Sequence, residues 1–398
     1  MLSGWWLWIA CGGTDADEPA CLDEVGVLCT VAGTGESGFA GDGGEARDAT
    51  LSFPIDVAFA PDGALHIADW NNGRIRRIDP DSGLIDTIAG SGELCAQEDV
   101  LGLDARDLCL NHPSDLDFTA AGEVLIAGWF NSRVFAVHLE SGVVTGVLGT
   151  GARGYDGEGG PATDAVFDTV ASTAHDPAGG LYLMDQQNQI IRRVDADGDI
   201  ALHAGGCVVE WDDAGAAPCA PDEAPVACPD SDKLTCGDPA TTCAYPCTPG
   251  FAGDGGPALG MRMGQTFGAQ AVPSGQLALA ADGTLYFSDP LNGRVRAIDP
   301  DGMVRTIADG LDEPADLALA PDGSLLVADL HDNCIVRVAP GGAIDTVAGA
   351  CGSEHDLAVD GTIATSAQLY FPFGVAFEDG TLYFTETGNH LVRAVRLE

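Results

Sequence analysis

One sequence unit recurs six times along the chain. Residues 54–69 read PIDVAFAPDGALHIAD, residues 314–329 read PADLALAPDGSLLVAD, and looser copies begin at Pro113, Val170, Ser274 and Pro372. A unit of this size cannot bury its apolar face alone and must stack against its neighbours. The repeat therefore constrains the fold more than any other feature. It predicts one repeat domain rather than the two or three that a length of 398 residues suggests.

Each copy contains the pattern of four short β-strands. Two apolar runs flank a glycine turn and predict a β-hairpin. An alternating run follows at 74–78, and a fourth run at 84–90 comes after the turn at 79–83. Corresponding residues such as Asp289 and Asp329 lie 40 positions apart where no insert intervenes. Four antiparallel strands in about 40 residues are typical of one propeller blade, so we predict an all-β, six-bladed β-propeller.

The two ends of the chain complement each other. Residues 26–33 resemble the fourth run of a unit, and the last unit runs only as far as its third. We therefore expect the amino-terminal strand to complete the sixth blade and to close the ring without a covalent bond. The resulting organisation is a leader-like segment and linker at 1–25, a propeller at 26–398, and a cysteine-rich insert at 207–249 between the third and fourth blades.

The repeat resembles a known family at several positions. Asn389-His390-Leu391 spells the signature of NHL repeats, and Asp69, Asn72 and the arginine-rich third run are similar to the bacterial form of that repeat. The resemblance covers about 26–398 apart from the insert, and it implies the propeller fold. It says little about chemistry, because similar propellers serve as ligand platforms, RNA binders and enzymes.

The charge of the chain excludes some partners. It carries 61 acidic and 17 basic residues, for a formal net charge of -44, and such a surface repels nucleic acid and anionic membranes. The arginines fall mainly in the predicted third strands, where the Asp69-type carboxylates can pair with them. No basic stripe for RNA can form, so we expect no nucleic-acid partner.

The first residues resemble an export leader. Residues 2–10 are apolar but fall far short of the roughly 20 residues that a membrane-spanning helix needs. Residues 8–12 (WIACG) resemble a lipobox, in which the cysteine is acylated after export. We expect lipidation of Cys11 and export as an outer-membrane or cell-surface lipoprotein or in secreted form. The alternative is an ordinary buried cysteine at an apolar amino terminus.

Cysteine usage also favours an oxidising compartment. The chain has 13 cysteines, and twelve remain for disulfides once Cys11 is set aside. Cys334 and Cys351 lie nearly opposite each other in the predicted hairpin, which predicts a disulfide between them. Proximity in sequence pairs Cys21 with Cys29 and Cys95 with Cys109. The insert cysteines are then expected to bond among themselves, with zinc as the alternative for the last two: Cys207, Cys219, Cys228, Cys236, Cys243 and Cys247.

The two faces of the predicted propeller differ. Turns after the first and third strands of a blade emerge on one face, and they are tight, as at 61–63 and 300–302. The segments between blades and the loops of Trp70 and Trp129 belong to the other face. Because long loops on a rigid scaffold usually carry the binding residues, we expect the working surface there.

Three inter-blade segments share a motif of their own: GFAGDGG at 38–44, GYDGEGG at 154–160 and GFAGDGG at 250–256. Each offers one aromatic ring, at least one carboxylate and a flexible backbone. One interpretation is an aromatic platform for a sugar or peptide. The alternative, which we favour, is that each ring fills a crevice between blades. The platform would contain Phe39, Trp70, Trp129, Tyr155 and Phe251.

The sequence offers little for catalysis. There is no Gly-x-Ser-x-Gly elbow, and the eight histidines share no position in the repeat. Asp56, Asp115 and Asp316, with Ser172 and Gln276, occupy one position near the start of the innermost strands. These oxygens could hold a cation such as Ca²⁺ at the tunnel mouth. The alternative, which we favour, is that the carboxylates accept hydrogen bonds from backbone N–H groups, so no cofactor is required.

Two classes of function follow. The first is an exported, non-enzymatic and monomeric scaffold that binds a protein or glycan on the long-loop face. The second is a metal-dependent propeller hydrolase or lyase that uses the tunnel-mouth carboxylates. An enzyme requires inward carboxylates and a histidine near one shared point, whereas a binding module is expected to have a plugged tunnel.

Overall fold

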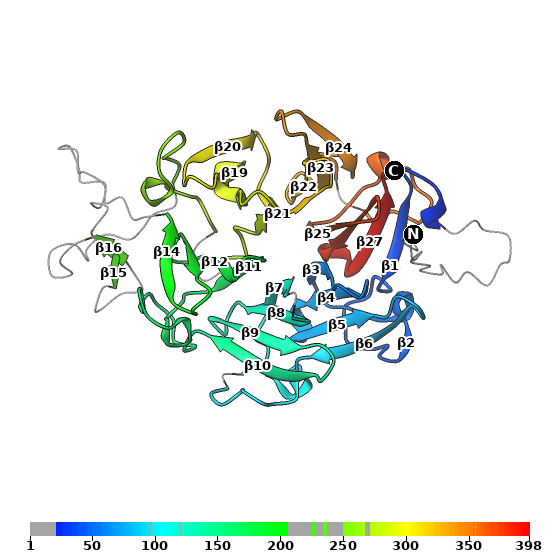
Figure 1. Ribbon diagram of the computed structural model, residues 1–398. Coiled ribbons are helices and arrows are strands. Elements are labelled where there is room, and N and C mark those ends of the chain that lie inside the picture. The colour runs from blue at the N-terminus through cyan, green and yellow to red at the C-terminus, as the bar shows by residue number, and fades with distance from the viewer. Residues whose placement is uncertain are drawn as a thin grey trace, which may run out of the picture.

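Alternating apolar residues and glycine turns fold each sequence unit into a four-stranded antiparallel sheet. The computed structural model describes residues 21–95, 97–119, 121–205, 225–227, 234–236, 250–266, 271–354 and 356–398. Six sheets stand around one axis (Figure 1), so the predicted six-bladed propeller is confirmed.

The blades follow one another in chain order. Blade 1 contains β3 (Pro54–Phe59), β4 (Leu65–Asp69), β5 (Arg74–Ile78) and β6 (Leu84–Ala89). Blade 2 contains β7 (Pro113–Phe118), β8 (Glu123–Gly128), β9 (Arg133–His138) and β10 (Val143–Leu148). Blade 3 contains β11 (Val170–Asp176), β12 (Gly180–Asp185), β13 (Ile190–Val194) and β14 (Ile200–Ala204).

Blade 4 contains β17 (Leu277–Leu279), β18 (Leu285–Asp289), β19 (Arg294–Ile298) and β20 (Val304–Asp309). Blade 5 contains β21 (Pro314–Leu319), β22 (Leu325–Asp329), β23 (Cys334–Val338) and β24 (Ile344–Ala348). Blade 6 contains β25 (Pro372–Glu378), β26 (Thr381–Glu386), β27 (Leu391–Arg396) and the amino-terminal β1 (Leu28–Ala32). The first strand of each blade lies innermost, and these six strands contact their neighbours round the axis.

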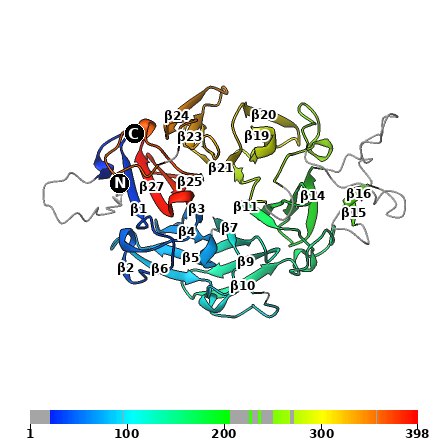
Figure 2. The same cartoon turned by 180° about the vertical axis from the view of Figure 1, so that it is seen from behind.

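The ring closes as predicted. β1 pairs antiparallel with β27, with Leu28 opposite Val395 and Thr30 opposite Arg393, and it lies beside β27 in both views (Figures 1 and 2). Cys21–Asp23 form a 3-10 turn that contacts β1 and β27, and Leu22 packs on the apolar cluster behind them.

Three predicted disulfides are present. The Cα–Cα distances are 5.9 Å for Cys21–Cys29, 5.4 Å for Cys95–Cys109 and 5.0 Å for Cys334–Cys351. The last pair confirms that Cys334 and Cys351 come close together across the β23–β24 hairpin, although the strands pair in a different register, with Val338 opposite Ile344 and a bulge between Ile335 and Val336. Cys11 and the insert cysteines other than Cys236 lie outside the described residues.

The insert between blades 3 and 4 contains one described two-stranded hairpin, β15 (Pro225–Ala227) paired with β16 (Leu234–Cys236). No helix among the described residues is long and apolar enough to span a membrane.

Candidate functional site

Four aromatic side chains of blades 1 and 2 meet on the long-loop face. Trp70 opens the 3-10 turn after β4, Trp129 directly follows β8, and their ring centroids lie 5.4 Å apart. His112, just before β7, lies 4.8 Å from Trp70 and 5.1 Å from Phe130. Phe130 lies 4.5 Å from Trp129. We call Trp70, His112, Trp129 and Phe130 the aromatic cluster.

The tryptophans of the aromatic cluster belong to a buried layer. The residue that directly follows the second strand is buried in all six blades: Trp70, Trp129, Gln186, Pro290, Leu330 and Thr387. The indole N–H of Trp129 donates to Oε1 of Gln186 at 2.8 Å, and the hydroxyl of Thr387 donates to the carbonyl of Pro54 at 2.6 Å. The indole of Trp129 is therefore held by a buried hydrogen bond to the next blade.

The outer rings of the cluster are accessible. Phe130 is 39% exposed and His112 is half-buried. Burial lowers the pKa of His112, which favours its neutral form at pH 7. The cluster thus presents an uncharged, partly apolar surface on a strongly acidic protein.

A second aromatic group lies on the long-loop side of blades 5 and 6. Tyr370 and Phe371 stack with centroids 4.8 Å apart, and His331 lies 5.9 Å from Phe371. Nδ1 of His331 is 3.0 Å from a carboxylate oxygen of Glu313. Sequence reasoning missed these residues as well as His112 and Phe130. Their place in the repeat could have indicated them. They lie next to the start of a first strand or the end of a second strand, as Trp70 and Trp129 do.

The predicted platform of five aromatic residues is not assembled. Phe39, Tyr155 and Phe251 each pack against an arginine of their own blade. The distances from the guanidinium carbon to the ring centroid are 3.8 Å for Arg74 over Phe39, 4.9 Å for Arg192 over Tyr155 and 4.1 Å for Arg294 over Phe251. Cation–π attraction therefore holds these rings apart in three different blades.

The carboxylates of the same motif explain its recurrence. Asp42 lies 2.6 Å from Arg76, Glu158 lies 2.8 Å from Arg192, and Asp254 lies 2.7 Å from Arg296. All three arginine side chains are fully buried, so each needs a countercharge. This favours the structural interpretation of the motif: its carboxylate pairs with the buried arginine of the blade that follows, and its ring lies about 5 Å from that same arginine, at 5.0 Å for Arg76, 4.9 Å for Arg192 and 4.9 Å for Arg296.

The expected pairing of these arginines with the end of the second strand is also present. Asp69 lies 3.3 Å from Arg76, Asp185 lies 3.6 Å from Arg192, Asp289 lies 3.3 Å from Arg296, and Glu386 lies 3.6 Å from Arg393. Burial outweighs the attraction of the arginine and raises the pKa of Asp69 to about 6 and that of Asp185 to about 7.

Two blades depart from this pattern. In blade 2, Gly128 and Phe135 replace both members of the ion pair, and the Phe135 ring lies where a side chain on Gly128 would extend. In blade 5, Val336 replaces the arginine while Asp329 remains, and burial raises the pKa of Asp329 to about 7.

The predicted metal ligands line a cavity that opens on the tight-turn face. The cavity has a volume of about 340 Å³, and Asp56, Asp115, Asp316, Asp117 and His175 contribute to its wall. The main-chain N–H of His175 donates to Asp117. Inward carboxylates and a histidine are therefore both present at this end of the tunnel, opposite the aromatic cluster.

The three aspartates of the tunnel connect neighbouring blades. Asp56 accepts from the N–H of Leu116 at 2.8 Å, and Asp316 accepts from the N–H of Val375 at 2.7 Å. Asp115 accepts from the N–H and the hydroxyl of Thr173, both at 2.8 Å. Each side chain therefore joins the first strand of its own blade to the first strand of another, as the structural alternative predicts.

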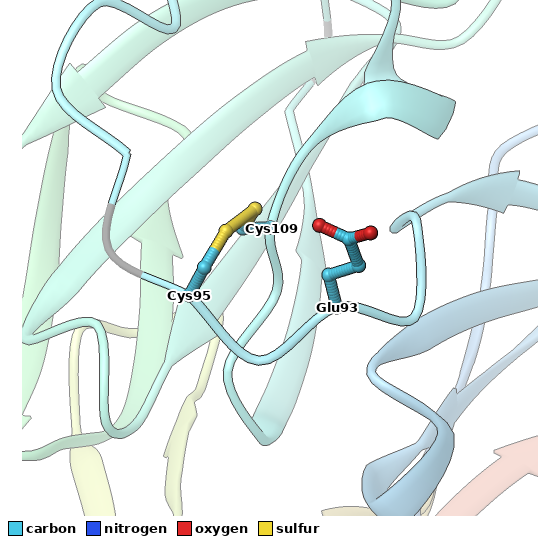
Figure 3. A group of neighbouring side chains, drawn as sticks. All are labelled: Glu93, Cys95 and Cys109. Carbon is cyan, nitrogen blue, oxygen red and sulfur yellow. A yellow bond between two sulfur atoms is a disulfide. The ribbon is translucent and has the colours of Figure 1, made fainter.

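The contacts of these carboxylates favour that alternative over a calcium site. Burial raises the pKa of Asp56 and Asp115 well above the usual range and that of Asp316 to about 8. Their oxygens also do not form a group within 4.8 Å of one another in the described part of the chain. The only such group there is Glu93, Cys95 and Cys109 (Figure 3), and its sulfurs form a disulfide rather than the thiolates that a metal requires.

Comparison with known proteins shows a similarity of fold. No family model matches the chain. Teneurin-m of Drosophila melanogaster is 30% identical over 186 residues, which are 43% of this chain and 6% of that protein. The chain therefore spans only a small part of this relative.

Solved structures resemble nearly the whole chain. A structural genomics protein of unknown function from Bacteroides thetaiotaomicron has a TM-score of 0.57 at 14% identity, covering 92% of this chain and 75% of its own. An auxiliary nutrient binding protein of the same organism has a TM-score of 0.55 at 13% identity, with 92% and 75% covered. A putative phosphatase of that organism has a TM-score of 0.56 at 15% identity, with 94% and 78% covered. At these identities the likeness shows the fold, and the chain is a six-bladed β-propeller whose repeats resemble NHL repeats.

Proposed function

We propose that this chain is an exported, non-enzymatic scaffold that binds a protein or glycan on its long-loop face, over the aromatic cluster. The observation that carries the proposal is the packing of Trp70, His112, Trp129 and Phe130 into one group whose outer rings are accessible. Aromatic rings held at fixed positions offer contact area at little cost in conformational entropy.

The charge of the protein narrows the class of ligand. A formal net charge of -44 repels polyanions, so the ligand is a neutral glycan or a peptide that is neutral or basic. The buried layer beneath the cluster supports rigid-body binding, because the rings are already placed before the ligand arrives.

Two further observations support the proposal. The disulfides Cys21–Cys29, Cys95–Cys109 and Cys334–Cys351 are typical of proteins that fold outside the cytoplasm. The neighbours of similar fold include auxiliary nutrient binding proteins, for which binding is the stated role.

The test measures binding of two defined probe sets, neutral oligosaccharides and basic peptides. Tryptophan fluorescence and calorimetry detect the binding. We expect one set to bind the full chain and the Phe130→Ala variant to weaken binding at least tenfold. Leu259→Ala, which removes another exposed apolar side chain, serves as the matched control and retains the affinity. Equal binding by Phe130→Ala and the parent would contradict the proposed site.

The second candidate is a hydrolase or lyase that uses the tunnel cavity on the tight-turn face. The observation that favours it is the presence of Asp117 and His175 in the wall of a cavity that also holds buried carboxyl groups. Without a metal, a neutral buried carboxylic acid could donate a proton to a leaving group. Turnover of any substrate that is abolished in both Asp117→Asn and His175→Ala, and unchanged in Phe130→Ala, would favour this function over the scaffold.

A further inference from the structure

The outermost strand is covered in five of the six blades. In each case the segment that precedes the blade runs antiparallel to the last strand of that blade. The bridged pairs are Glu45 with Leu84, Asp104 with Val143, Pro161 with Asp199, Pro257 with Met303, and Ile363 with Val27. In blade 1 this contact is regular enough to form β2 (Gly44–Glu45), which adds a fifth strand next to β6 (Figure 1). We call these five segments the covering segments.

The covering segments bond in the same way. A glycine N–H donates to the carbonyl of an apolar residue near the start of the outer strand, at 2.8 Å for Gly43 to Ile85 and for Gly159 to Ile200, and at 3.0 Å for Gly361 to Leu28. Three residues after that glycine, an alanine N–H donates to the carbonyl of the glycine in the turn that leads into the outer strand. An example is the bond from Ala162 to Gly198 at 2.9 Å.

The sequence of a covering segment follows from these contacts. The first residue is glycine in all five because its φ is positive, between 74° at Gly159 and 87° at Gly361. The fourth is alanine in all five, since it is buried against the sheet and leaves no room for a larger side chain. The shared pattern is Gly-x-x-Ala, found at 43–46, 102–105, 159–162, 255–258 and 361–364.

Blade 5 has no covering segment in the described part of the chain. Only residues 310–313 connect β20 to β21, and this length is too short to reach the outer strand. Among the described residues, β24 pairs with β23 alone, and it lies on the rim of the ring (Figure 1). Its N–H and C=O groups on the outer side are therefore without strand partners in the part of the chain that the structure describes.

Without a covering segment, the side chains of β24 are more exposed than those of the other outer strands. Ile344 is 40% exposed, whereas the residues at the same position in the other five blades are no more than 1% exposed: Leu28, Ile85, Val144, Ile200 and Val304. Residues 341–346 are all exposed, so nothing in the described structure blocks the edge. An edge of this kind is a template for one more strand.

We propose that β24 is a docking site for an extended segment of a partner polypeptide that carries a Gly-x-x-Ala pattern and adds to blade 5 as its fifth strand. The five covering segments show what fills the equivalent place. The N–H groups of the partner donate to the carbonyls of Ile344 and Gly342, and its carbonyl accepts from the N–H of Ile344. This mode of recognition is β-strand addition. The inference is independent of the aromatic cluster, which lies in blades 1 and 2.

The most suitable probe is a peptide of residues 100–108 (VLGLDARDL), the covering segment of blade 2. Blades 2 and 5 both lack the buried arginine, since Phe135 and Val336 stand in its place. The covering segment of blade 2 therefore already packs on a blade without this arginine, as the partner of blade 5 must. We expect a fluorescein-labelled copy to bind the full chain saturably in an anisotropy titration. A peptide in which the alanine is replaced by aspartate is expected to bind at least tenfold more weakly.

The variant Ile344→Pro removes only the outward N–H, because the equivalent N–H groups of Ile200 and Val304 donate to covering segments and not to the third strand. We expect a loss of affinity of about tenfold or more, as for one or two lost hydrogen bonds. The matched variant Ile344→Thr keeps the N–H and is expected to bind within about threefold of the parent.

Hydrogen exchange gives a readout that does not depend on the probe. In the free protein, the amide of Ile344 is expected to exchange fast and those of Leu28, Val144, Ile200 and Val304 slowly. Slow exchange at Ile344 in the free monomer would show that the chain covers its own edge and would overturn the proposal. Absence of peptide binding to the parent would also overturn it. Self-association that Ile344→Pro abolishes would assign the edge to a second copy of this chain instead of a different partner.

Discussion

Asp360 accepts two hydrogen bonds from Thr30, a residue 330 positions earlier in the chain: one from its N–H at 2.8 Å and one from its hydroxyl at 2.7 Å. Thr30 lies in β1, which completes blade 6, and Asp360 lies in the covering segment of that blade. Arg47 also bonds to the same carboxylate. One side chain thus ties the closing strand to the segment that precedes its blade.

We expect Asp360→Ala to lower the free energy of unfolding by about 2–3 kcal/mol, because the substitution removes an acceptor shared by a backbone N–H, a hydroxyl and a guanidinium. Urea unfolding measures the change. Glu354→Ala, an exposed carboxylate of the same connection, is the control and is expected to have no measurable effect. Equal stability of the two variants would contradict the role of Asp360 in closure.

The disulfide between Cys334 and Cys351 joins the start of β23 to the residues after β24. Cys351→Ser is expected to destabilise the chain by about 3 kcal/mol, because the bond then no longer closes the loop between residues 334 and 351 in the unfolded state. Thermal unfolding of the variant, compared with the parent in oxidised form, measures the loss. A peptide map that joins Cys334 to a cysteine other than Cys351 would refute this pairing.

The ion pair of Arg76 and Asp69 can be tested against the blade that lacks it. Arg76→Phe alone is expected to cost about 3–5 kcal/mol, because it leaves the carboxylate of Asp69 buried without its cation. The double variant Asp69→Gly with Arg76→Phe copies Gly128 and Phe135 of blade 2 and is expected to recover part of that loss. Urea unfolding of the parent, both single variants and the double variant gives the coupling free energy between positions 69 and 76. Strictly additive effects would contradict the coupling of the two sites.

Asp316 makes stability depend on pH. Burial raises its pKa in the folded protein to about 8, above the ordinary value of 3.8. The folded state therefore holds a proton that the unfolded state releases between these values, and the stabilisation present below pH 3.8 is lost as the pH rises through 8. We expect the parent to lose stability between pH 5 and pH 9, and Asp316→Asn to show a shallower loss. The exposed Asp301→Asn is the control, and a slope equal to that of the parent in Asp316→Asn would count against this assignment.

Gly374 tests the packing of the innermost strands. A Cβ atom at this position would lie 2.5 Å from Cα of Asp56 and 2.6 Å from the carbonyl oxygen of Ile55, both in the backbone of β3. Gly374→Ala is therefore expected to cost about 1–3 kcal/mol or more through overpacking, measured by thermal unfolding. Gly260→Ala has open space around its added methyl group and is expected to be neutral. A tolerated alanine at 374 would mean that β25 and β3 are further apart than described.

The architecture could be predicted from the amino-acid sequence. Alternation with a period of two, glycine turns and the repeat length are local signals, and they predicted four strands per blade, six blades and closure by 26–33. The Cys334–Cys351 disulfide followed from the predicted hairpin, because the turn between two antiparallel strands brings the residues that flank them together.

The contacts between side chains of different blades could not be predicted in this way. Trp70 and Trp129 come together with His112 and Phe130, whereas Phe39 and Phe251 stay on arginines of separate blades. The three tunnel aspartates bond to backbone N–H groups of neighbouring blades, and among the residues that the structure describes β24 is the one outer strand without a covering segment. These contacts join residues tens to hundreds of positions apart, and their partners are chosen by packing between blades, which no local pattern encodes.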